Sequence, residues 1–124
     1  SKKLLIYGHN SSKIDMPFKI LEEFYDKDYY DNHKYVDLTT STTKKRYEIF
    51  SVYVEPTDYS YMNLNFNSDE EYLNHLKKLK GKSMYDTGVE VTKDDEILIL
   101  QTCSTHKDYH NYQKKYLLII LRRV

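Results

Sequence analysis

The sequence predicts a mainly β fold, an antiparallel sheet or barrel with helices added in its loops. Two patterns lead to this prediction. Short apolar or alternating runs, which are typical of strands, recur along the chain, whereas apolar residues at helical spacing occur in two places. The 124 residues show no internal repeat and no Gly/Ser linker, so we expect a single domain over residues 1–124.

We expect about six strands. Residues 4–7 form a short apolar run ended by Gly8, and further strand patterns lie at 35–39, 96–102 and 116–121. The strand expected over 46–54 alternates between two faces. One face carries Tyr47, Ile49, Ser51 and Tyr53, and the other carries Glu48, Phe50, Val52 and Val54.

Two helices are expected between these strands. Asp15 and Pro17 are typical of a helix start, and apolar residues follow them at helical spacing. In the second helix, Ser68 and Glu71 form a capping-box pattern in which each side chain satisfies the other's backbone donor, and Gly81 is expected to end the helix. Residues 26–33 and 56–67 are expected to be polar connections.

Composition excludes several classes of function. Lys plus Arg and Asp plus Glu each number 19, and a neutral balance argues against a broad nucleic-acid surface. No apolar run approaches the roughly 18 residues that cross a bilayer, and no signal-peptide pattern is present. The single cysteine, Cys103, cannot form a disulfide within the chain. No glycine-rich phosphate loop, paired-carboxylate motif or G-x-S-x-G is present.

Cys103 and His9 each follow an expected strand closely. If the two strand ends are adjacent, these residues form a thiol–imidazole pair. A free thiol has a pKa near ~8.5, and a nearby imidazolium stabilises the nucleophilic thiolate. The same histidine can then protonate a leaving amine. The alternatives are a buried inert cysteine and a loop histidine with no task.

A third group should stabilise the developing oxyanion, and arginine suits this role. Arg46 lies in mid-strand, and Arg122 lies about 20 Å from the start of the last strand. If that strand runs antiparallel to the cysteine strand, Lys114 and Lys115 lie nearest to Cys103.

Other residues have weaker patterns. Cys103, His106 and His110 have a loosely zinc-like spacing, but they supply three ligands with no obvious fourth. His33 and His75 are expected to be solvated. Tyr59 and Tyr61 are expected to be half-buried surface aromatics, with a groove wall as the alternative.

Several of these stretches resemble the sortase family. Leu-Ile-Tyr-Gly-His-Asn at 5–10 and Leu-Gln-Thr-Cys at 100–103 resemble its histidine and cysteine signatures. Segments within 24–53, the run Ser-Met-Tyr-Asp-Thr at 83–87, and a helix between the two strands before the cysteine resemble class B. The resemblance covers nearly the whole chain and implies a sortase-type β-barrel.

The resemblance implies a cysteine transpeptidase of Gram-positive cell surfaces, with no cofactor. Such enzymes cleave a C-terminal sorting motif of surface proteins, hold the peptide as a thioester, and pass it to a cell-wall amine. By resemblance Cys103 is the nucleophile and His9 the acid/base. The residues implied to contact the peptide are Thr57, Tyr61 and Met62 in the groove wall, and Gln101 and Ser104 beside the nucleophile.

The sequence departs from the family in two respects. The family places an arginine near the start of the last strand, where this chain has Lys115 or the adjacent Lys114, which offer a point charge in place of a fork. Family members also carry a membrane anchor, N-terminal helices and early barrel strands before the histidine strand. We expect the anchor, the helices and the early strands to lie in a segment outside this chain. We expect that segment to place the protein on the extracellular face of the membrane. A non-catalytic, sortase-like peptide-binding module is the alternative function.

Overall fold

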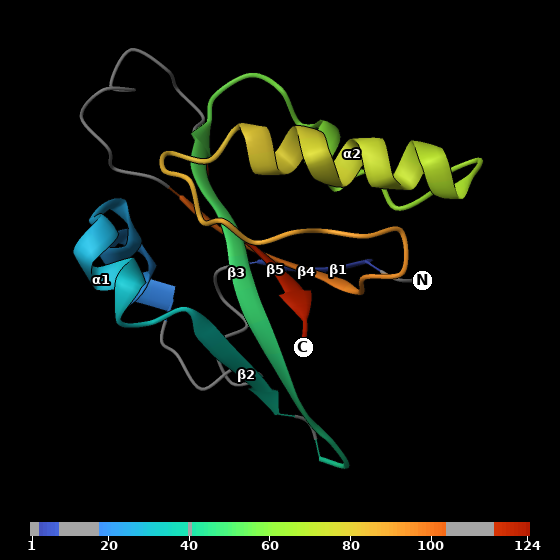
Figure 1. The fold of residues 1–124 in the computed structure, drawn as a ribbon. Helices are drawn as coiled ribbons and strands as arrows, with labels where there is room; N and C mark the ends of the chain where they lie inside the picture. Colours follow the sequence, from blue (N-terminus) through green and yellow to red (C-terminus); the bar gives the residue numbers. More distant parts are fainter. Residues whose placement is uncertain (1–2, 8–17, 40, 104–115) are drawn as a thin grey trace.

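The computed structural model describes residues 3–7, 18–39, 41–103 and 116–124, and for residues 4–7, 18–21 and 103 it describes the backbone alone. In these residues five strands form one curled sheet in the order β1-β4-β5-β3-β2 (Figure 1). The strands are β1 (Lys3–Tyr7), β2 (Tyr35–Thr39), β3 (Lys44–Glu55), β4 (Ile97–Cys103) and β5 (Tyr116–Arg123). The mainly β prediction is confirmed. The β1–β4 pair is parallel and the other three pairs are antiparallel, so the sheet is mixed.

A β-bulge in β3 changes which residues share a face. Ile49 pairs with Leu121 of β5 and Ser51 pairs with Ile120, so Phe50 is an extra residue in the ladder. The alternation therefore changes phase at this point: Phe50 lies opposite Ile49 as expected, but the face assignments expected beyond residue 50 are wrong. Val52 and Val54 share a core cluster with Tyr47 and Ile49, whereas Phe50 and Tyr53 belong to the cluster on the other face.

Helix α2 (Asp69–Gly81) begins at the expected cap. The Glu71 N–H donates to Ser68 Oγ at 3.1 Å, which confirms half of the capping box. The Glu71 carboxylate accepts from the Asn67 N–H at 3.2 Å instead of from Ser68. Gly81 belongs to the last helical turn and Lys82 is the C-cap, so the helix ends one residue later than expected.

The segment before β2 is more helical than expected. A 3-10 helix, η2 (Phe18–Tyr25), lies where the first helix was expected. The short helix α1 (Lys27–Asp31) follows it in the stretch that was expected to be a polar connection. The Asp26 carboxylate accepts from the Asp28 N–H at 2.9 Å and so caps α1. The expected start at Asp15 and Pro17 lies outside the described residues. A further 3-10 turn, η3 (Ser60–Met62), lies in the loop after β3.

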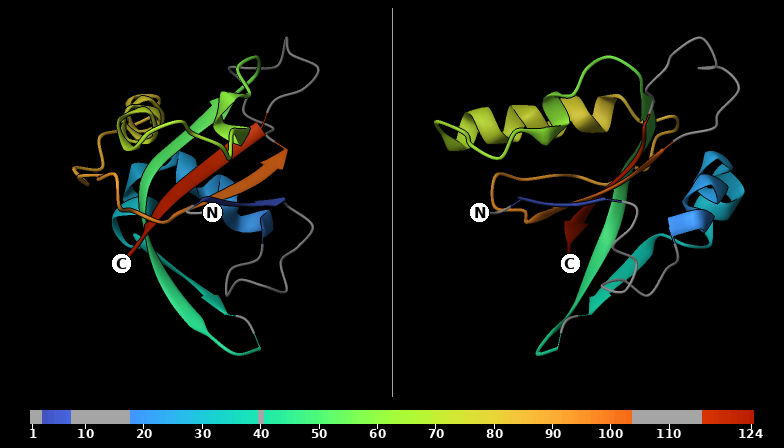
Figure 2. Two further views of the ribbon diagram at one scale, coloured as in Figure 1. Left: turned by 90° about the vertical axis from the view of Figure 1, so that its right-hand side faces the viewer. Right: turned by 180° about the vertical axis from the view of Figure 1, so that it is seen from behind.

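Both faces of the sheet are covered, and for this reason residues 97–100 of β4 and 117–121 of β5 are all apolar. On one face Leu76 and Leu79 of α2 pack against Ile97 and Ile99. On the other face residues of η2 and α1, including Phe24, pack against the alternate side chains of the same strands. Figure 2 shows α2 and the η2–α1 segment on opposite sides of the curled sheet. Among the described residues no helix has the length and apolar character needed to cross a bilayer.

Candidate functional site

Four strand termini meet at one edge of the sheet. Tyr7, the last residue of β1, pairs with Gln101 of β4, and Cys103 ends β4 two residues later. Cys103 pairs with Tyr116, the first residue of β5, and Tyr116 also pairs with Glu55, the last residue of β3. The end of β1, which precedes His9, and the end of β4, at Cys103, are therefore adjacent, as the thiol–imidazole hypothesis requires. His9 and the Cys103 side chain lie outside what the structure describes, so their contact stays a prediction.

All three arginines of the chain lie at the opposite end of the sheet. Arg122 pairs with Ile97, six residues before Cys103 and about 20 Å away along the strand. Its guanidinium donates to Glu48 at 2.8 Å, while Arg46 donates to Asp37 at 2.9 Å. No arginine therefore lies beside the backbone of Cys103. Lys114, Lys115 and Ser104 are outside the described residues, but the antiparallel β4–β5 pairing that brings the start of β5 to Cys103 is confirmed.

Two residues implied to contact the peptide contact each other. The Tyr61 hydroxyl donates to Gln101 Oε1 at 2.9 Å, and the two side chains are 1% and 6% exposed. Tyr61 is thus fully buried, not half-buried as expected. The bond fastens the loop after β3 to a point two residues before Cys103. A contact of either residue with a peptide stays a prediction.

The exposed part of this loop borders the same sheet edge. Thr57 and Met62 are exposed, and the Tyr59 ring packs edge-on against Tyr116 with 5.9 Å between ring centroids. The Tyr59 hydroxyl donates to the Pro56 carbonyl at 3.1 Å, which orients the ring. Tyr59 is therefore accessible beside the residue that pairs with Cys103, and Thr57 and Met62 are accessible in the same loop.

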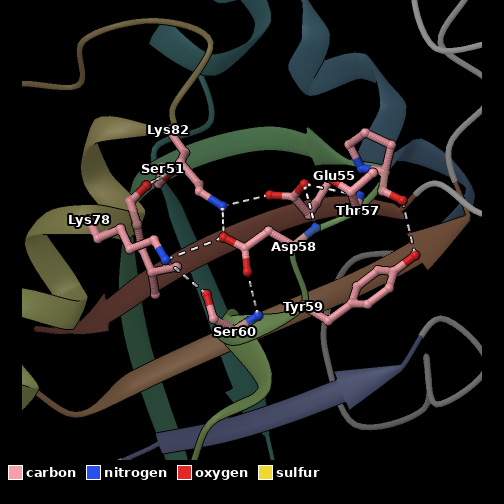
Figure 3. Close-up of polar contacts among 10 residues, drawn as sticks. Ser51, Glu55, Thr57, Asp58, Tyr59, Ser60, Lys78 and Lys82 are labelled. Atoms are coloured by element: carbon pink, nitrogen blue, oxygen red, sulfur yellow. Dashed lines mark hydrogen bonds and ion pairs between the residues drawn. The ribbon is translucent and has the colours of Figure 1, made fainter.

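A charged network supports the start of the loop, and Figure 3 shows its members. Lys82 Nζ lies 2.7 Å from Glu55 Oε1 and 2.6 Å from Asp58 Oδ2, and Lys78 Nζ lies 3.3 Å from the same Asp58 oxygen. The hydrogen bond from Lys82 holds the pKa of Asp58 well below its usual range. Burial alone would lower the pKa of Lys82, but its bonds to Asp58 and Glu55 raise it. Lys82 lies 27 residues from Glu55 and 24 from Asp58, and no local sequence motif predicts contacts over such separations.

A buried lysine supports the end of the same loop. Lys3 is 5% exposed. Its ammonium donates to the carbonyl of Tyr61 and, at 2.6 Å, to the carbonyl of Asn63. Its Nζ also lies 2.8 Å from His75 Nε2. Burial lowers the pKa of Lys3 to about 8. Burial, with the adjacent ammonium of Lys3, lowers the pKa of His75 to about 4. The expectation that His75 is solvated is wrong, because α2 presents it to the core side, where it is 9% exposed.

The metal alternative gains no support from the part of the chain that the structure describes. No group of three His, Cys, Asp or Glu side chains in it is arranged to hold a metal ion. The candidate ligands Cys103, His106 and His110 lie outside the described side chains, so this alternative is untested. His33, the other histidine expected to be solvated, is exposed, and its ring stacks on Tyr29 at 3.9 Å.

Comparison with known proteins decides the family. The family model described as a sortase domain matches residues 1–120. The chain belongs to the sortase family. The resemblance to class B is also confirmed, because the named relatives of this sortase are sortases B. Sortase B of Listeria monocytogenes is 36% identical over 108 residues, which cover 87% of this chain and 44% of the relative. Sortase B of Staphylococcus aureus is 28% identical over 118 residues, which cover 95% of this chain and 47% of the relative.

Solved sortase structures share the fold. A structure described as a Staphylococcus aureus sortase B–substrate complex matches with a TM-score of 0.80 and 25% identity, and the match covers 99% of this chain and 55% of that chain. This sortase therefore spans about half the length of the curated relatives that it matches. Its curled sheet, with α2 between β3 and β4, corresponds to that part of the sortase B fold.

Proposed function

We propose that this protein is a cysteine transpeptidase that cleaves a C-terminal sorting motif of surface proteins and transfers the acyl group to a cell-wall amine. The observation that carries the proposal is the sheet edge at which β1, β4 and β5 meet, because it brings the end of the histidine strand beside the end of the cysteine strand. The sortase family match and the sortase B relatives support the same reaction class. We further propose that it acts at the extracellular face of the membrane.

In the proposed reaction the Cys103 thiolate attacks the carbonyl carbon of the scissile peptide bond. The carbon–nitrogen bond breaks as His9 gives its proton to the leaving amine, and a thioester to Cys103 remains. An amine of the cell-wall peptide then attacks the thioester carbonyl and forms a new amide. The sulfur leaves as thiolate, and the proton lost by the attacking amine returns to His9. Lys115 is the proposed cation for the oxyanion formed in both steps.

The experiment is intact-mass spectrometry of the protein after incubation with a randomised pentapeptide library. We expect an acyl adduct on Cys103 that disappears when triglycine is added, together with the appearance of the peptide–triglycine amide. The Cys103→Ala variant is the control and should carry no adduct. A library that leaves the wild-type mass unchanged, while Cys103 is fully reduced, contradicts the transpeptidase proposal.

A non-catalytic peptide-binding module is the second candidate, and the position of the arginines favours it. All three arginines lie at the end of the sheet far from Cys103. Stabilisation of the oxyanion would therefore depend on a lysine, whose ammonium is a point charge without the fixed donor fork of a guanidinium. This candidate predicts peptide binding with no acyl adduct. Lys115→Arg distinguishes the two, because turnover that appears only in that variant indicates a binding module that has lost a catalytic contact.

A further inference from the structure

The loop after β3 is held by carboxylates that bind its backbone. Glu55 Oε2 accepts from the N–H groups of Thr57, at 3.2 Å, and Asp58, at 3.0 Å. Asp58 Oδ1 accepts from the Ser60 N–H at 3.0 Å. Two carboxylate side chains thus hold the backbone N–H groups of three loop positions (Figure 3). Because Glu55 is only 7% exposed, its negative charge requires a partner inside the protein.

Lys82 is the partner that both carboxylates share. Its ammonium bridges Glu55 Oε1 and Asp58 Oδ2 at 2.7 and 2.6 Å, and its side chain is 26% exposed. Without this cation the two carboxylates would repel each other, and the buried one would be left without its counter-charge. Lys78 contributes less, because it is 52% exposed and contacts only Asp58 and Ser60 of the loop.

The network ends directly beside the candidate reaction edge. Glu55 pairs with Tyr116, which pairs with Cys103, so the backbone of Glu55 lies two strand spacings from that of Cys103, about 10 Å. Tyr59, between the anchored positions Asp58 and Ser60, packs on Tyr116. A movement of the loop would therefore displace Thr57 and Tyr59 relative to the position at which a peptide would react.

We propose that Lys82 is a positioning residue for peptide recognition, which fixes the loop of Thr57 and Tyr59 against the sheet edge through Glu55 and Asp58. This inference rests on the proposed function, since it assumes that the loop contacts the peptide substrate. Lys82 itself contacts no substrate. Its loss should weaken ground-state and transition-state binding equally and leave the chemistry at Cys103 intact, which raises KM and spares kcat.

The test measures four variants on the peptide from the randomised pentapeptide library that acylates the wild type fastest. Lys82→Met should raise KM about tenfold with kcat within about twofold. Lys82→Arg keeps the charge and should stay within about threefold of wild-type KM. Lys78→Met should raise KM only about two- to threefold, because the ion pair of an exposed lysine contributes less than that of Lys82. Lys77→Met removes an exposed lysine of the same helix outside the network and should match the wild type.

Two readouts separate positioning from general loss of structure. Amide hydrogen exchange at Thr57, Asp58 and Ser60 should accelerate in Lys82→Met, whereas exchange in β4 and β5 should stay at its wild-type rate. The rate of Cys103 alkylation by iodoacetamide should also be unchanged. A Lys82→Met protein with wild-type KM overturns the inference, as does one in which kcat and the alkylation rate fall together. A wild type that forms no adduct with any library peptide overturns the proposed function, and the positioning role with it.

Discussion

The buried pair of Lys3 and His75 makes the stability of this fold depend on pH below neutrality. The Lys3 ammonium has three N–H donors, and the carbonyls of Tyr61 and Asn63 and the ring nitrogen of His75 can accept from all three. His75 must be neutral at Nε2 to accept from Lys3. Protonation would place two cations 2.8 Å apart in a site where His75 is 9% exposed.

The size and sign of the effect follow from the pKa of His75. The unfolded chain takes up a proton on this histidine near pH 6.5, whereas the folded protein takes it up only near its lowered pKa of about 4. Between these values the unfolded state binds more protons, so the free energy of unfolding falls as the pH falls from 6.5 towards 4. The full shift corresponds to a loss on the order of 3 kcal/mol.

The variant His75→Gln isolates this contribution. Glutamine offers Lys3 an uncharged acceptor and does not titrate, so the variant should lose less stability than the wild type on acidification. Urea unfolding of both proteins near neutral pH and at about pH 4.5 measures the difference, and the carboxylates common to both proteins cancel in the comparison. His33→Gln, which removes an exposed histidine, is the control and should behave as the wild type. Equal acid sensitivity of the wild type and His75→Gln would refute the reasoning.

Substitutions at three further positions test the packing that holds the site. Tyr61→Phe removes the donor to Gln101 and should lower the free energy of unfolding by about 1–3 kcal/mol, measured by urea titration, because the buried amide oxygen loses its hydroxyl partner. Ser68→Ala should lower the free energy of unfolding by about 1 kcal/mol, because α2 loses its cap. Ser68→Asp keeps a capping oxygen and should keep the wild-type free energy of unfolding. Leu76→Ala, at a fully buried position between α2 and the sheet, should cost about 2–5 kcal/mol in the same titration, and a loss below 1 kcal/mol would contradict the assigned packing.

The sequence was sufficient where a local pattern determines the structure. The strand expected at 96–102 is β4, in which Ile97 and Ile99 lie on one face and Leu98 and Leu100 on the other. The Ser68 cap is also local, because the bond spans three residues. The bulge at Phe50 has no such signature. The strand reads as regular alternation, and only the pairing with β5 determines where the extra residue lies.

The candidate site shows the same division. Cys103 and His9 were found from strand-end positions and family motifs, and the parallel β1–β4 pairing now brings the two strand ends together. His75 was misjudged, because helical spacing alone does not reveal that Lys3, 72 residues away, shares its buried site. Lys82 and Glu55, 27 residues apart, were missed for the same reason. Contacts that only the tertiary fold creates leave no spacing rule in the sequence.

The central claim is that Cys103 is activated by His9, and the pH dependence of Cys103 alkylation by iodoacetamide tests it most directly. The account predicts that the wild-type rate reaches its plateau well below ~8.5, the pKa of a free thiol, and that His9→Ala moves the rise to that value. A wild-type rate that rises only near ~8.5 and is unchanged in His9→Ala would contradict the claim.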